Sequence, residues 1–149
     1  MRISRTPVTL SPRRKLLLYA ATGLLWVTGV IYIGVQYSSQ GAYEITPVGH
    51  WVQSVSMKIH GAVAMIFLMI FGGLLLDHVP TGWRKNEKRI TGVWQVVVCS
   101  LLILTGWGLY YLGNEEWRSR TRWLHVAVGL FLPLLILVHV KFAGIKKRD

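Results

Sequence analysis

The sequence predicts an all-α fold, a single up-and-down bundle of four transmembrane helices. Of the 149 residues, 52% are hydrophobic, and the mean hydropathy of the chain is positive. Four apolar stretches each approach the length needed for one membrane crossing. A bilayer offers no water to unpaired backbone amides, so these stretches are expected to be helices. Too few residues remain for a soluble domain, and residues 1–149 are expected to form one integral membrane domain.

The helices are expected at about residues 16–35, 59–78, 92–112 and 122–141. The first helix carries glycines among large apolar residues, so we expect it to serve only in packing and anchoring. In the polar segment 38–54 that follows it, His50 is expected to be solvated at the membrane interface. Pro80 is expected to mark the end of the second helix, because proline disfavours helical backbone at the preceding residue.

The charge distribution predicts that both termini are cytoplasmic. The chain has a net charge of +11, and its basic residues precede the first apolar stretch, fill the second connection and follow the fourth stretch. Residues 36–53 contain no lysine or arginine. This pattern follows the positive-inside rule, with short basic segments on the cytoplasmic side. The basic residues do not form a continuous basic surface of the kind that binds nucleic acid. We therefore expect membrane lipid and no nucleic acid as partner.

Four histidines are the strongest candidates for function. His60 and His78 lie in the second apolar stretch, and His125 and His139 lie in the fourth. At about 100° and 1.5 Å per residue, each pair lies on one helix face, with separations of roughly 27 Å and 21 Å. Up-and-down connectivity makes the two helices parallel, so His60 should meet His125 near the outer face and His78 should meet His139 near the inner face. Ionisable groups are costly in hydrocarbon, and four at matched depths indicate function.

Two imidazoles at each depth fit haem iron better than another metal. Imidazole also binds zinc and copper, but only Asp77 borders a membrane span, whereas a zinc or manganese transporter is expected to line its route with acidic ligands. Catalytic zinc needs three protein ligands, and the chain, with its single cysteine, has no Cys-x-x-Cys-His for a c-type haem. We therefore expect two haem b groups, with one as the alternative, and as metal ligands His60, His125, His78 and His139.

Basic residues close to these histidines are candidates for binding the haem propionates. The outer candidates are Lys58, Arg118 and Arg122, with Arg120 in reserve, and the inner candidates are Arg84, Lys85 and Lys141. The three arginines of the third connection exceed what the positive-inside rule explains, and propionates supply a reason for them. Ordinary snorkelling is the alternative for all of these side chains. Asp77 is expected to be solvated, with orientation of the His78 ring as its alternative role.

A family resemblance covers most of the chain from the second helix onward. It rests on Lys58-Ile59-His60-Gly61-Ala62 with Asp77-His78-Val79, on Thr105-Gly106 through Leu109-Tyr110-Tyr111-Leu112-Gly113 to Arg118, and on Trp123-Leu124-His125 with His139. These stretches resemble small bacterial four-helix membrane cytochromes b of the cytochrome b-561-like class. The resemblance implies axial ligation of b haems by the four histidines, electron transfer between quinols and redox partners, and a place in the bacterial inner membrane.

The expected function is therefore single-electron transfer across the membrane between a quinone or quinol pool and a redox partner. Iron with two axial ligands has no open position, so no catalytic residue is expected, and whether the chain is an enzyme stays open. Gln95, Ser100 and Thr105 are candidates for a quinone site or for hydrogen bonds between helices. Two alternatives remain: a membrane anchor or single-haem subunit of a larger redox complex, and a metal-ion transporter with histidine sites.

Overall fold

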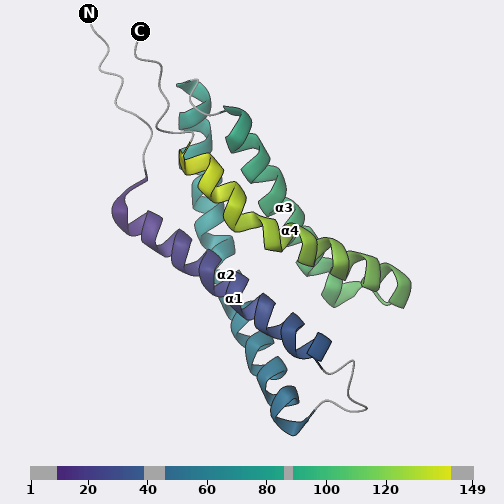
Figure 1. Ribbon diagram of the computed structural model, residues 1–149. Coiled ribbons are helices and arrows are strands. Elements are labelled where there is room, and N and C mark those ends of the chain that lie inside the picture. Colours follow the sequence, from purple (N-terminus) through teal and green to yellow (C-terminus); the bar gives the residue numbers. More distant parts are fainter. Residues whose placement is uncertain (1–9, 39–45, 86–88, 142–149) are drawn as a thin grey trace, which may run out of the picture.

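The computed structural model describes residues 10–38, 46–85 and 89–141, and it folds as four helices (Figure 1). Their bounds are α1 Pro12–Ser38, α2 Pro47–Arg84, α3 Arg89–Tyr111 and α4 Glu115–Lys141. The described residues contain no strand, and all four helices are long and apolar enough to cross a membrane. The prediction of an all-α four-helix transmembrane bundle is confirmed, and the chain is a multi-pass membrane protein.

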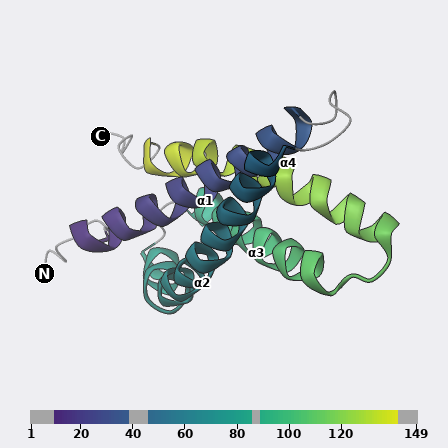
Figure 2. The ribbon, with the colours of Figure 1, turned by 90° about the horizontal axis from the view of Figure 1, so that it is seen from below.

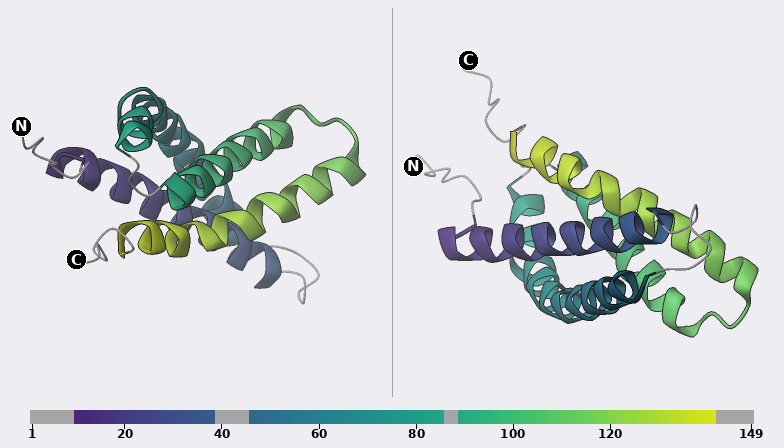
Figure 3. Two further views of the ribbon diagram at one scale, coloured as in Figure 1. Left: turned by 90° about the horizontal axis from the view of Figure 1, so that it is seen from above. Right: turned by 60° about the horizontal axis from the view of Figure 1, so that its bottom comes forward.

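The bundle is built from two antiparallel hairpins, α1 with α2 and α3 with α4. Contacts within each hairpin are extensive, whereas those between the hairpins are fewer. Seen from below and from above, the hairpins cross one another at an angle (Figures 2 and 3). The start of α1, the end of α2, the start of α3 and the end of α4 lie at one end of the molecule (Figure 1). This arrangement gives the expected up-and-down order and makes α2 and α4 run in the same direction.

A small apolar core joins the hairpins. It consists of Ala21, Val63, Phe67, Phe71, Cys99 and Leu132. The rings of Phe67 and Phe71, one turn apart on α2, stack with their centres 6.1 Å apart. The indole Nε1 of Trp26 on α1 donates to the backbone carbonyl of Leu130 on α4 at 3.4 Å. Many large apolar side chains on the outside of the bundle are exposed, which suits a surface that faces lipid.

α2 begins about twelve residues earlier than expected. The Thr46 hydroxyl accepts a hydrogen bond from the Gly49 amide at 3.1 Å, and Pro47 follows at the first helical position, where no amide donor is needed. The second half of the polar segment 38–54 therefore forms the first turns of α2. His50 is exposed there, in agreement with its expected solvation.

The prediction that Pro80 ends α2 is wrong, because the helix continues to Arg84. Beyond the proline, the Lys85 amide bonds the Thr81 carbonyl at 3.1 Å. The Thr81 hydroxyl donates to the Asp77 carbonyl at 2.7 Å. Pro80 removes only the amide that would bond the Leu76 carbonyl, and the helical hydrogen bonds continue beyond it, so one missing amide does not end the helix.

α4 also starts earlier than expected, at Glu115 and not near residue 122. The Asn114 side-chain oxygen accepts from the amides of Glu116 and Trp117 at 3.0 and 3.1 Å, which caps the helix. Two glutamates in the first turn stabilise the helix, because their negative charges interact favourably with the positive end of the helix dipole. The arginines assigned to the third connection therefore lie on α4 itself.

Candidate functional site

His60 of α2 and His125 of α4 face one another between the two hairpins. Their ring centres are 6.4 Å apart, and the ring planes are inclined by 67°. Both side chains are half-buried. The structure thus brings together the two histidines that were expected to meet near the outer face.

The His60 ring is held by α1. Its Nδ1 lies 3.0 Å from the hydroxyl oxygen of Thr28, a buried residue. The ring lies against the next residue, Gly29, where an added Cβ would be 3.6 Å from the ring carbon Cε1. We call this arrangement, a threonine hydroxyl at Nδ1 and a glycine beside the ring, a Thr-Gly cradle. The expectation that α1 serves only in packing is wrong, since Thr28 contacts a candidate ligand.

His125 has a Thr-Gly cradle on α3. Its Nδ1 lies 2.8 Å from the hydroxyl oxygen of buried Thr105, and a Cβ at Gly106 would be 3.4 Å from its Cε1. Thr105, considered above for a quinone site, is therefore a hydrogen-bonding partner of a candidate ligand. We refer to Thr28, His60, Thr105 and His125 together as the His60 level.

His139 repeats this arrangement one step further along the same hairpin. Its Nδ1 lies 3.0 Å from the hydroxyl oxygen of Thr91, and a Cβ at Gly92 would be 3.9 Å from its Cε1. Thr91 and Thr105 are fourteen residues apart on α3, and His125 and His139 are fourteen apart on α4. Equal steps on two antiparallel helices keep both contacts in register.

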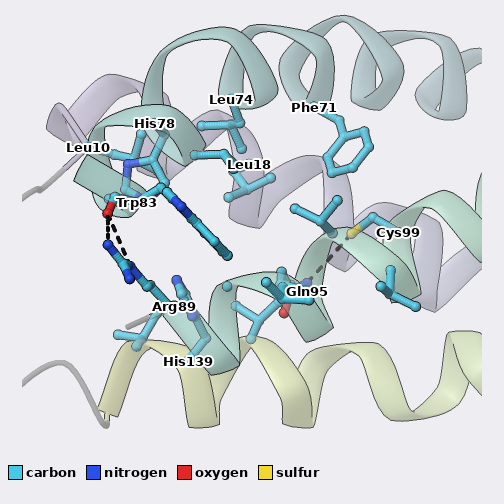
Figure 4. A pocket seen from close by; sticks show the side chains of 18 of the residues that line it. Leu10, Leu18, Phe71, Leu74, His78, Trp83, Arg89, Gln95, Cys99 and His139 are labelled. Carbon is cyan, nitrogen blue, oxygen red and sulfur yellow. Dashed lines mark hydrogen bonds between the residues drawn. The ribbon is translucent and has the colours of Figure 1, made fainter. Parts of the chain in front are cut away.

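His78 and His139 line one cavity of about 270 Å³, and Figure 4 shows their rings approaching it from α2 and α4. Its wall is mainly apolar, with side chains that include Leu18, Phe71 and Leu74. The cavity is slightly smaller than the range of about 300–1,000 Å³ typical of small-molecule sites. The two histidines expected to meet near the inner face thus share one cavity, and we refer to this region as the His78 level.

Arg89 is the basic residue that lines this cavity, and the sequence analysis did not single it out. Its Nε and Nη2 donate to the Trp83 carbonyl at 3.1 and 2.7 Å, and its guanidinium carbon lies 5.0 Å from the centre of the Trp83 ring (Figure 4). The predicted inner candidates Arg84, Lys85 and Lys141 are exposed and do not line the cavity. Arg89 lies three residues before Gly92 and so on the same face of α3, which is the signal that could have identified it.

The outer basic candidates lie outside the contacts of the His60 level. Lys58 is exposed on α2. Arg118 forms an ion pair with Glu115, and Arg122 Nη2 lies 3.8 Å from the same carboxylate. Arg120 pairs with Glu116 at 2.5 Å. Ion pairs within the first turns of α4 are one reason for the arginine excess there, and the propionate role of these residues stays a prediction.

The remaining candidates have other surroundings. Asp77 is 66% exposed and its carboxylate lies 3.3 Å from Arg14, which agrees with its expected solvation. Gln95 lines the cavity and its amide lies 3.6 Å from the sulfur of Cys99. Ser100 is half-buried on α3. The structure therefore brings Gln95, but not Thr105, to the His78 level.

The donor set was tested against the coordination needs of haem. Among the residues that the structure describes, no three metal-ligating side chains form a group. A porphyrin supplies four nitrogens itself, so two axial imidazoles complete the coordination of its iron. With a metal–imidazole bond of about 2.0 Å and a ring centre about 1.2 Å behind the ligating nitrogen, two opposed ligands have ring centres about 6.4 Å apart. The ring centres of His60 and His125 are 6.4 Å apart, so this pair has the separation that two opposed ligands need.

Fold and site together define the class of the protein as a four-helix membrane protein with two levels of paired histidines. Comparisons of the chain with protein-family models, curated proteins and solved structures give no match. The resemblance to cytochromes b of the b-561-like class accordingly rests on the sequence motifs quoted above.

Proposed function

We propose that this protein is a di-haem b-type membrane cytochrome that carries single electrons across the membrane between a quinone or quinol pool and a redox partner. The observation that carries the proposal is the facing of His60 and His125 at the ring separation of two axial ligands. In this proposal His60 and His125 hold one haem, and His78 and His139 hold the other across their shared cavity. Haem iron, when bound, supplies a one-electron couple without an open coordination position.

The chain's own residues then have three tasks. The histidines fix the two cofactor levels, roughly 21 Å apart along α4 at about 1.5 Å per residue. The apolar core around Phe67 and Phe71 keeps water from the space between the levels. The guanidinium of Arg89 at the cavity favours a carboxylate there, which makes it our candidate for a propionate of the second haem.

The distribution of charge supports an orientation with the His78 level towards the cytoplasm. Seven described basic residues lie at the helix ends on that side of the bundle: Arg13, Arg14, Lys15, Arg84, Lys85, Arg89 and Lys141. The opposite end carries the arginines of α4 together with two glutamate partners. By the positive-inside rule, we propose cytoplasmic termini in a bacterial inner membrane.

The test is a reduced-minus-oxidised visible spectrum of the purified protein, combined with its haem-to-chain ratio. We expect a b-type spectrum and two haems per chain. The substitutions His125→Ala and His139→Ala should each remove about half of the haem. His50→Ala is the control, because His50 is exposed at the start of α2 and belongs to neither level; this variant should keep both haems.

Other outcomes identify the rival functions. A single haem that survives His139→Ala would indicate a single-haem subunit or anchor built on His60 and His125. A colourless protein from haem-replete cells would contradict the proposal. If that colourless protein also supported metal-dependent flux in vesicles, the histidines would belong to a metal-ion transporter.

A further inference from the structure

The hydroxyl protons of Thr28 and Thr105 are already used within their own helices. The Thr28 oxygen lies 2.7 Å from the Leu24 carbonyl and 3.1 Å from the Leu25 carbonyl. The Thr105 oxygen lies 2.7 Å from the Leu101 carbonyl and 3.2 Å from the Leu102 carbonyl. A hydroxyl has one proton and a carbonyl can only accept, so each hydroxyl donates to its helix.

The direction of the two threonine–histidine hydrogen bonds follows from this proton count. With its proton given to a carbonyl, each threonine oxygen can only accept from the imidazole Nδ1, at 3.0 Å for His60 and 2.8 Å for His125. A neutral imidazole has a single N–H, so when Nδ1 carries it, Nε2 is left with a bare lone pair. That nitrogen is the one available for a metal.

We propose that Thr28 and Thr105 are positioning residues for the His60-level haem. They select the tautomer that leaves Nε2 of both histidines free, and they hold both rings at the separation that one iron requires. This inference rests on the proposed function. A hydrogen bond accepted from Nδ1–H also makes an imidazole a stronger donor to the metal, which favours the oxidised iron. The two hydroxyls therefore lower the midpoint potential of this haem relative to the same site without them.

The test is potentiometric titration of the purified full-length protein, with Thr28→Val and Thr105→Val. Each substitution removes a hydroxyl acceptor and should shift one of the two midpoint potentials in the positive direction, while the other potential stays in place. The double variant should shift the same potential further. Thr28→Ser restores the hydroxyl and should return the potential towards its original value.

The chain offers two matched controls. Thr22, on the same helix as Thr28, is equally buried and donates to the Leu18 carbonyl at 2.8 Å, but it makes no hydrogen bond to a histidine. Thr22→Val should leave both potentials unchanged. Thr91 contacts His139, so Thr91→Val should move the potential of the other haem. The inference is overturned if Thr28→Val moves both potentials equally, or moves them no more than Thr22→Val does.

A separate measurement distinguishes failure of this inference from failure of the proposed function. If the preparation is colourless, the function fails, and the ¹⁵N ring shifts of histidine in the full-length protein still report the tautomers. Nδ1–H should dominate at His60 and His125, and Thr28→Val should abolish that preference at His60 alone. Dominance of Nε2–H in the unsubstituted protein would overturn the inference even if the protein binds haem.

Discussion

The two histidine levels of this bundle are prepared in different ways. At the His60 level, the ring centres are 6.4 Å apart and each ring is held by a buried threonine. At the His78 level, the two histidines border a cavity of about 270 Å³. At the first level both rings are held by buried threonines, whereas at the second Thr91 contacts His139 and a cavity lies beside the two histidines. One bundle can therefore preorganise a cofactor site through its ligands or through its cavity, and the two levels should respond to different substitutions.

The difference originates in α1. This helix places Thr28 and Gly29 beside His60. Eighteen residues earlier, in the register of His78, the chain has Leu10, which lies two residues before α1 begins. Leu10 lines the cavity and does not offer a hydroxyl. α3, in contrast, supplies a Thr-Gly cradle at both levels. The asymmetry between the levels is thus an asymmetry between the two hairpins.

The largest difference between the levels should come from filling the cavity. Leu74 lines it from α2, and Leu74→Trp adds an indole to the space that we propose for the second haem. We expect loss of about half of the haem, with the midpoint potential of the His60-level haem retained. The haem-to-chain ratio and a redox titration measure both effects.

Leu75→Trp is the matched control for this substitution, because Leu75 is exposed on the neighbouring face of α2. It should keep both haems. If Leu74→Trp also kept both haems, the cavity would not be the second haem site.

The second largest effect, on stability and on the haem spectrum, should come from substitution of Gly106, the glycine beside the His125 ring. Alanine gains up to about 1 kcal/mol over glycine in a helix. At Gly34, where an added Cβ meets nothing within 4 Å, that gain should appear in full. At Gly106 the Cβ would lie in van der Waals contact with His125 Cε1, at 3.4 Å, so the gain in stability should be smaller than at Gly34, and the haem spectrum of this level should change.

Thermal unfolding in detergent, followed by circular dichroism and visible absorption, compares Gly106→Ala with Gly34→Ala. Equal stabilisation of the two variants with unchanged spectra would show that the His125 ring does not depend on Gly106. Gly92→Ala, with a Cβ distance of 3.9 Å to His139, should lie between these two variants.

The fold and the pairing of the histidines were predictable because both depend on simple periodicities. Apolar length determines a membrane crossing, and the steps between histidines on parallel helices determine which of them share a depth. The helix ends were predicted less well. The signals for earlier starts were present in Thr46-Pro47 and in Asn114-Glu115-Glu116, but the hydropathy of the apolar stretches outweighed these short capping patterns.

The Thr-Gly cradles could not have been selected from the sequence. The chain contains five Thr-Gly dipeptides, beginning at Thr22, Thr28, Thr81, Thr91 and Thr105. Thr22 and Thr81 donate only to their own helices, at the Leu18 and Asp77 carbonyls. Which dipeptide faces a histidine depends on the register of each hairpin, and that register is determined by packing along the whole hairpin.

A smaller effect is expected from the arginines at the start of α4. If Arg118 and Arg122 also act on propionates of the His60-level haem, Arg118→Gln and Arg122→Gln should lower its midpoint potential, since a lost positive charge disfavours reduction. Exposed charge pairs contribute at most about 1 kcal/mol, which corresponds to about 40 mV for one electron. Arg120→Gln, which breaks the ion pair with Glu116, tests the reserve candidate in the same way. If all three variants kept the midpoint potential of the unsubstituted protein, these arginines would serve only as helix-stabilising partners of the glutamates.

The smallest effect should come from Asp77, although it is the neighbour of His78 in sequence. Its carboxylate is 66% exposed and pairs with Arg14 at 3.3 Å, and exposed pairs of this kind contribute about 0–1 kcal/mol to stability. Asp77→Asn and Arg14→Gln break the same ion pair from its two sides, so both should lower the unfolding temperature slightly and equally. Neither should move the midpoint potential of the His78-level haem as far as Thr91→Val does. A shift of that size in Asp77→Asn alone would mean that this carboxylate orients the His78 ring, and the two levels would then differ in the chemistry of their hydrogen-bond acceptors as well as in their space.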